Sequence, residues 1–143
     1  MQIRIRKTDL EKSRHAKAPS VIPLKDKDLE TAREIKAFLD KTYSVHHSCD
    51  DLVKKFGMNK LKLKTAFKAV SNTSLHEYVT RVRIENAKVL LENTNRTIAD
   101  IAKKVGLHKT NFIKQFKHYT GKTPTEWRNN PDLIDLAWER SGS

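Results

Sequence analysis

Hydrophobic side chains recur at helical spacing along most of this chain, with charged residues between them. The first periodic run should form a helix from Asp28 to about Tyr43, with one apolar stripe. Residues 1–25 precede it and lack this period. Pro19 and Pro23 disfavour a helix there, so we expect a basic, loosely held arm.

A short helix, a glycine and a second helix follow. Ser48 can cap the first helix, which should run to about Phe56, and Gly57 suits a left-handed stop. The second helix should begin near Asn59 and end near Val70. Its apolar positions lie three or four residues apart and would face a core: Leu63, Ala66, Phe67 and Val70.

A longer periodic run from Ser74 to Asn93 predicts a linker helix. Its buried stripe should hold Leu75, Tyr78, Val79, Val82, Ala87, Leu90 and Leu91. Beyond it, Thr97 can cap a short helix that stops at Gly106. A helix from Lys109 to about Tyr119 follows, with Phe112 and Phe116 inward. Further turns are expected at Thr125–Asn129 and Leu133–Trp138.

The chain repeats itself at a shift of 49 residues. The shift superposes Asp51 on Asp100, Gly57 on Gly106 and Phe67 on Phe116. Each copy contains a short helix, a glycine turn and a second helix, which is the helix-turn-helix arrangement. A solenoid of helical hairpins is the alternative, but solenoids usually need about three or more repeats.

We therefore predict an all-α, homeodomain-like protein with two helix-turn-helix subdomains joined by a long linker helix. The expected divisions are an arm (1–25), a first subdomain (26–73), a linker (74–94), a second subdomain (95–130) and a tail (131–143).

The outward faces of the two second helices carry the candidate binding residues. In the first unit this face holds Leu61, Lys64 and Thr65, and in the second it holds Thr110, Asn111, Ile113 and Lys114. Asn111 could pair with adenine, Thr110 or Ile113 could touch a thymine methyl group, and the lysines can reach guanine edges. Candidates for contact with phosphates are Lys60, Lys62, Lys68, His108, Lys109 and Lys117. The bland interpretation is a solvated lysine face, but the matching placement on two equivalent helices favours DNA.

Net charge agrees with a polyanionic partner. Lys and Arg total 29 against 17 Asp and Glu, giving a net charge of +12 and a pI near 9.9. The single cysteine, Cys49, excludes an intramolecular disulfide, and we expect it to be a small buried residue. With no apolar membrane span or signal-peptide core in the sequence, we expect a cytoplasmic, nucleoid-associated protein.

The sequence contains little that points to a catalytic site or a metal site. No phosphate-binding glycine loop, nucleophile elbow or paired-carboxylate site is apparent, and Asp50, Asp51 and Asp100 are better explained as helix starts. His46, His47 and Cys49 match no strong zinc spacing. We expect no enzyme activity, cofactor or metal.

Several motifs together resemble the AraC/XylS family of transcription regulators. They are Arg83-Ile84 followed by Ala87 and Leu90-Leu91, then Ile98 through Ile101-Ala102 to Gly106, then Phe116-Lys117 and Gly121-Lys122-Thr123-Pro124. The resemblance covers about residues 28–130. It implies a seven-helix domain, promoter binding by both recognition helices and activation through RNA polymerase. It also implies base contacts by Leu61, Lys64 and Thr65 in the first unit and by Thr110, Asn111 and Lys114 in the second. Arg83 is implied to be structural, partly buried and paired.

The chain departs from the family pattern at three places. Gly106-Leu107 stands where the family usually has Gly-Phe. The stretch from Gly106 to Phe112 looks one residue shorter than usual, which would rotate the second recognition helix. Asn72 replaces a usual glycine, although Asn tolerates the left-handed backbone.

Other interpretations stay open at this point. The chain is either a stand-alone binder or a fragment whose Ile3–Ile5 segment is a remnant of a further domain. Its oligomeric state is open, and binding as a monomer is feasible. The alternative functions are a non-specific architectural nucleic-acid-binding protein and a protein-interaction adaptor that uses Trp138.

Overall fold

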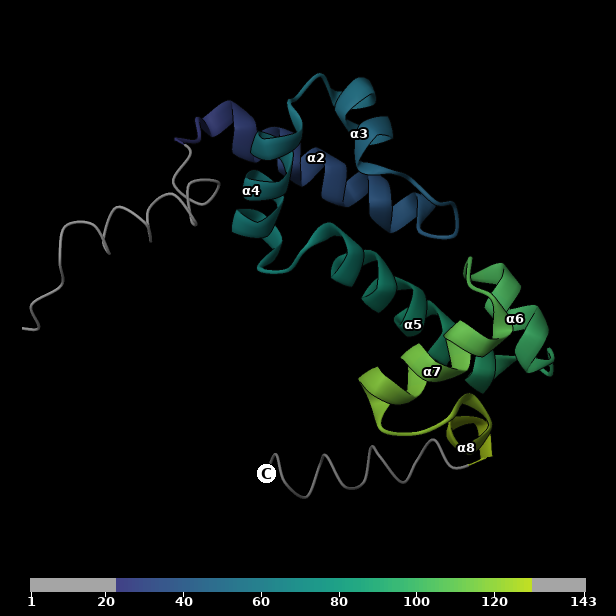
Figure 1. Ribbon diagram of the computed structural model, residues 1–143. Helices are drawn as coiled ribbons and strands as arrows, with labels where there is room; N and C mark the ends of the chain where they lie inside the picture. Colours follow the sequence, from purple (N-terminus) through teal and green to yellow (C-terminus); the bar gives the residue numbers. More distant parts are fainter. Residues whose placement is uncertain (1–22, 130–143) are drawn as a thin grey trace, which may run out of the picture. The chain divides into compact units, whose positions relative to one another are not determined.

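The computed structural model describes residues 23–129, and this part of the chain is built from helices (Figure 1). In chain order the helices are α2 (Asp26–Thr42), α3 (Cys49–Phe56), α4 (Lys60–Ser71), α5 (Leu75–Asn93), α6 (Ile98–Lys104), α7 (Lys109–Thr120) and α8 (Pro124–Asn129). The expected all-α class is confirmed.

The helices divide between two compact units. The first unit runs to Phe38 and resumes at His47–Leu75. The second unit takes Leu39–His46 and continues from His76. Helix α5, the expected linker, therefore belongs to the second unit from its second residue onward.

The capping residues act as the sequence predicted. The Ser48 hydroxyl accepts a hydrogen bond from the Asp51 amide, and the Asp51 carboxylate accepts one from the Ser48 amide, which completes a capping box. Thr97 caps α6 through the Asp100 amide. Asn72 adopts the left-handed backbone at φ 63°, as expected for this replacement of glycine.

Buried side chains of α2, α3 and α4 form the core of the first unit. Ala32 and Ile35 come from α2, Leu52 comes from α3, and Leu63, Ala66 and Phe67 come from α4. At the side of this core the Phe38 and Phe56 rings meet edge to face, with centroids 5.6 Å apart. Every one of these helices therefore has an inner face fixed by apolar burial.

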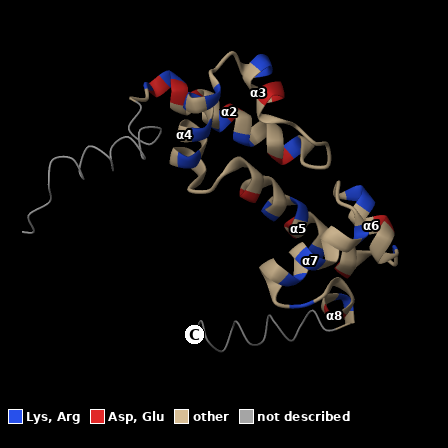
Figure 2. Cartoon of the chain, in the orientation of Figure 1, with Lys and Arg blue, Asp and Glu red and all other residues tan. Residues whose placement is uncertain are grey.

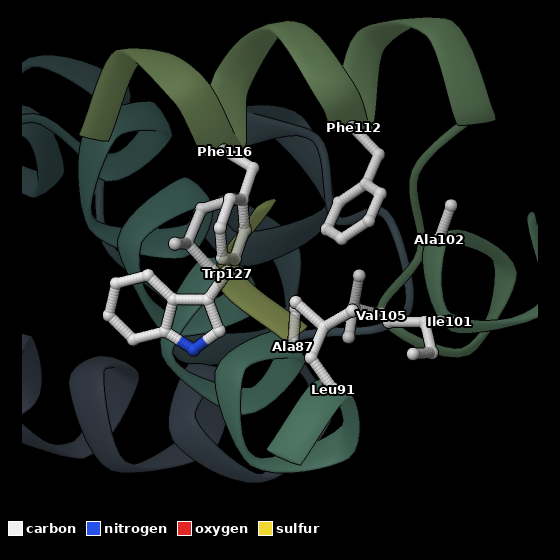
Figure 3. Packing of buried hydrophobic residues seen from close by; sticks show 9 residues of the cluster. Ala87, Leu91, Ile101, Ala102, Val105, Phe112, Phe116 and Trp127 are labelled. Atoms are coloured by element: carbon white, nitrogen blue, oxygen red, sulfur yellow. The ribbon is translucent and has the colours of Figure 1, made fainter. Parts of the chain in front are cut away.

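In the core of the second unit, three aromatic rings contact one another edge to face, one after the next (Figure 3). The Phe112 and Phe116 rings of α7 lie 5.7 Å apart, and the Phe116 and Trp127 rings are also 5.7 Å apart, each pair edge to face. Ile101, Ala102 and Val105 pack from the α6 side, and Ala87 and Leu91 pack from α5. Trp127 Nε1 donates to the Glu92 carboxylate at 2.8 Å, which satisfies the indole N–H.

The buried stripe of α5 differs from the expected one. Its buried residues are Thr80, Ile84, Ala87 and Leu91. The expectation was right for Ala87 and Leu91, whereas the other five residues of the expected stripe are only half-buried: Leu75, Tyr78, Val79, Val82 and Leu90. Thr80 can be buried because its hydroxyl donates to the His76 carbonyl at 2.9 Å.

Some sequence expectations lie outside the described residues. These are the arm up to residue 22 with its Ile3–Ile5 segment, the tail at 131–143, the helix at Leu133–Trp138 and the adaptor role of Trp138. Within residues 23–129, none of the helices combines the length and the apolar character needed to cross a bilayer.

Truncating the central ring of the second core should be costly. Phe116→Ala should lower the free energy of unfolding by about 3–5 kcal/mol, because a fully buried ring is replaced by a cavity. Val89→Ala, on the exposed side of α5, is the control and should stay within about 0.5 kcal/mol. Urea denaturation followed by circular dichroism measures both values, and equal effects would contradict this core assignment.

The capping carboxylates should also make the stability of the fold decline at acid pH. Hydrogen bonds from Ser48 hold the pKa of Asp51 below its ordinary value, and hydrogen bonds from Thr123 do the same for Glu126. A depressed folded-state pKa stabilises the fold above the unfolded-state value and is lost as pH falls through the folded-state value. Thermal melts between about pH 5 and pH 2 should therefore show a decline that Asp51→Asn weakens. Asp50→Asn, which removes a neighbouring charge and leaves the capping box, should keep the decline.

Candidate nucleic-acid interface

Helices α4 and α7 are equivalent elements of the two units. Each has 12 residues, and α7 begins 49 residues after α4. Each ends at a left-handed residue, Asn72 or Gly121, whose amide bonds the carbonyl of Lys68 or Lys117. The repeat found in the sequence is therefore a repeat of structure.

A glycine with positive φ stands before each of these helices. Gly57 has φ +65° and Gly106 has φ +88°, and each is followed by two residues before the helix begins. The Gly106 amide bonds the Lys103 carbonyl at 3.1 Å and the Leu107 amide bonds the Ala102 carbonyl at 2.8 Å. This pair of bonds closes the end of α6 as a Schellman motif. Within the chain the two turns have equal length, and a rotation of α7 relative to the family stays a prediction.

Burial of the inner faces decides which side of α4 and α7 is available. Phe67 anchors α4 from behind, and Phe112 and Phe116 anchor α7. The exposed positions of both helices carry lysines, and Figure 2 marks the lysines of each helix in blue along the cartoon. On both helices the cationic face is therefore the outer one.

The outer face of α4 holds the first-unit candidates. Lys60, Lys64 and Lys68 are exposed, and Leu61 is 44% exposed, which is unusual for a large apolar side chain. Thr65 is half-buried, and its hydroxyl donates to the Leu61 carbonyl at 2.9 Å. Its methyl group can therefore face outward beside Leu61.

Two lysines of α4 lie near carboxylates of their own unit. Lys60 Nζ is 3.8 Å from Asp50, in a well-exposed pair that contributes little. Lys62 Nζ is 3.7 Å from Asp28, and these side chains are only 33% and 15% exposed. Lys62 would have to leave Asp28 to reach a phosphate, so it is the least available of the six phosphate candidates.

The outer face of α7 holds the second-unit candidates. His108, Lys109, Thr110, Asn111, Lys114 and Lys117 are all exposed. The Asn111 side-chain carbonyl lies 3.5 Å from Gln115 Nε2, which is long for a hydrogen bond, and Asn111 is exposed. The structure thus brings all the second-unit candidates to one helix and its first turn.

Comparison with known proteins fits this geometry. A family profile described as "Helix-turn-helix domain" matches residues 52–130, more than half of the chain. The chain is also 32% identical over 96 residues to the HTH-type transcriptional activator AarP of Providencia stuartii, covering 66% of this chain and 71% of AarP. The chain belongs to the AraC/XylS family of helix-turn-helix transcription regulators.

Longer family members share the same region. The Msm operon regulatory protein of Streptococcus mutans is 32% identical over 107 residues, which is 69% of this chain and 38% of that protein. The chain thus spans well under half the length of that regulator. The DNA-binding domain of AdpA, solved in complex with a target DNA, superposes with a TM-score of 0.66 at 16% identity, covering 68% of this chain and 89% of that one. This likeness shows a shared fold.

Arg83 agrees with what membership of the AraC/XylS family implied. It is half-buried, and its Nε donates to the Tyr43 carbonyl at 2.6 Å. Burial also lowers the pKa of its guanidinium. The residue is therefore paired as expected, with a backbone carbonyl as its partner.

The last turns of α3 and α6 are also basic, and their lysines are not among the residues that the sequence marked as candidates. Lys54 and Lys55 are exposed in α3, and Lys103 and Lys104 are exposed at the equivalent place in α6. Both pairs coincide under the shift of 49 residues, and this coincidence could have marked them as candidates.

The residues considered for a metal site do not form one. Cys49 is half-buried, although the sequence analysis predicted that it would be buried. The half-buried His47 ring packs against the Phe38 ring, with the two ring centroids 4.9 Å apart. In residues 23–129 there is no group of three or more His, Cys, Asp or Glu side chains placed to hold an ion.

The two outer helices differ at the N-cap, the residue just before each helix begins. The Asn59 side chain accepts from the Lys62 amide at 2.8 Å, whereas His108 makes no such side-chain bond at the start of α7. His108→Asn should stabilise the second unit by about 0.5–1 kcal/mol, and Asn59→Ala should destabilise the first by about 1 kcal/mol. Thermal melts of both variants test this, and a destabilised His108→Asn protein would show that His108 has a structural partner.

Proposed function

We propose that this chain binds double-stranded promoter DNA in a sequence-specific way and regulates transcription, with α4 and α7 inserted in successive major-groove segments. The observation that carries the proposal is the pair of equivalent helices, each anchored by buried phenylalanine and each with a cationic outer face. An α-helix fits the major groove, where base pairs can be told apart.

The polar and apolar groups divide by what they can recognise. Asn111 offers a donor and an acceptor that match an adenine edge, and the methyl groups of Thr110, Thr65 and Leu61 suit thymine. Lys64 and Lys114 lie beside them on the outer faces and can reach guanine. Phosphate contacts are assigned to Lys60, Lys68, Lys109, Lys117 and His108, with Lys62 after release from Asp28.

The length of α5 supports two insertions on one duplex. Its 19 residues rise about 28 Å, and one face of B-DNA presents its major groove about every 34–36 Å. Bending of the DNA would accommodate the remainder. Promoter DNA would then contact a monomer through both units.

Regulation would follow from the DNA-bound position. Membership of the AraC/XylS family supports RNA polymerase as the protein partner and activation as the outcome. With this activity the protein would act in the cytoplasm, at the nucleoid. The chain is expected to act as a regulator without catalysing a reaction.

The second candidate function is non-specific, architectural binding, which the net charge of +12 favours. Site selection from random duplexes with the purified chain, followed by competition at about 0.15 M salt, distinguishes the two. Specific binding predicts an enriched sequence bound about 10³-fold or more tightly than random DNA. Equal binding of all duplexes, with a steep salt dependence, would leave only the architectural function.

Two outer-face substitutions should fail in different ways. Asn111→Ala should remove discrimination worth about 1–3 kcal/mol at one base position, because a bidentate contact is lost. Lys68→Ala should weaken all sequences alike and reduce the salt slope by about 1. Binding titrations on the selected site and on single-base variants measure both, and a uniform loss in both proteins would contradict this division of roles.

A further inference from the structure

The segment Leu39–His46 lies between parts of the first unit in sequence but belongs to the second unit. We call this segment the strap. It comprises the last turn of α2 and the loop that follows. It also precedes residues 52–130, the region that the helix-turn-helix profile matches.

Two side chains of α5 hold the strap. The Tyr78 hydroxyl donates to the Asp40 carboxylate, and Arg83 Nε donates to the Tyr43 carbonyl at 2.6 Å. Tyr43 is itself half-buried and packs against the core cluster that contains Phe112 and Phe116. The strap is thus joined both to α5 and to the core behind α7.

The strap also lies directly over the turn between α6 and α7. A Cβ placed on Gly106 would be 2.4 Å from the Ser44 carbonyl oxygen and 2.9 Å from its carbon. The other two glycines of the described chain that have positive φ, Gly57 and Gly121, have open space at the same position. The first unit therefore has no equivalent of this close approach at its own turn glycine.

We infer that the strap is a positioning element for the second recognition helix, in which Arg83 and Tyr78 hold Ser44 against Gly106 and so fix where α7 begins. The inference rests on the proposed function, because it assigns the strap a part in base reading by α7. Helix α7 starts three residues after Gly106, and Thr110 and Asn111 lie in its first turn. A base contact requires close placement of the side chain, so a looser turn should reduce discrimination.

The glycines provide a matched test of the steric contact. Gly106→Ala and Gly121→Ala introduce the same methyl group at similar positive φ, +88° and +83°, so the backbone strain is matched. Only Gly106→Ala meets Ser44. Gly106→Ala should reduce discrimination at the base positions read by α7 at least tenfold and leave discrimination at the positions read by α4 unchanged. Gly121→Ala should leave discrimination unchanged at both sets of positions. Equal effects of the two substitutions would overturn the inference.

A second pair of variants acts without a change in the turn itself. Arg83→Met removes the bond to Tyr43, and Arg81→Met removes an exposed arginine two residues earlier on α5. Arg83→Met should speed hydrogen exchange of the hydrogen-bonded amides at 105–107 and reduce discrimination at the α7 positions. Arg81→Met should leave exchange at 105–107 unchanged, and Arg83→Lys should restore part of the discrimination. If Gly106→Ala folds poorly, the arginine variants test the inference in its place.

Exchange and DNA binding separate the two hypotheses. If the wild-type protein selects no sequence, the proposed function fails, and with it the base-reading role of the strap. Faster exchange at 105–107 in Arg83→Met would then still establish that the strap supports the turn. If the wild-type protein selects a sequence and Arg83→Met lowers affinity for all sequences alike, the strap stabilises the fold without positioning α7.

Discussion

Burial of one face of α4 and of α7 is the constraint on which the site depends. Phe67 in the first unit, and Phe112 and Phe116 in the second, are at most 1% exposed. Because these rings fill the cores, each helix can present only its opposite face to a partner. That face carries the lysines, and turning it inward would bury unpaired charge at great cost. The position of the cationic surfaces is thus a consequence of aromatic packing.

The two units share a plan but differ in detail. In the first, Asn59 caps the outer helix, Lys62 lies near Asp28, and Gly57 has open space around it. In the second, the N-cap residue His108 makes no side-chain hydrogen bond to the outer helix, and Gly106 lies against the strap. The turn glycine of the second unit thus has a close backbone neighbour from outside its helix-turn-helix, and the turn glycine of the first unit has none within the described residues.

The sequence predicted local structure well because the signals are local. Ser48, Thr97 and Gly57 act on backbone groups within a few residues, and the shift of 49 residues revealed the two units before any packing was known. All the site candidates lie on or beside the outer helices as expected, and their contacts with DNA stay predictions. Contacts between distant residues were not predictable. Neither the bond from Arg83 to Tyr43 nor the approach of Ser44 to Gly106 leaves a periodic pattern in the sequence. The burial of Thr80 was missed for a different reason: a polar residue breaks the hydrophobic pattern, and its hydroxyl is satisfied by the His76 carbonyl of the same helix.

The central claim is that both outer helices read the major groove of one duplex. Methylation interference on a selected site measures this directly, because methylation of guanine N7 blocks contacts in the major groove. We predict two clusters of interfering guanines, one for each helix, with centres about 10 base pairs apart. A single cluster, or interference that does not depend on position in the site, would contradict the account.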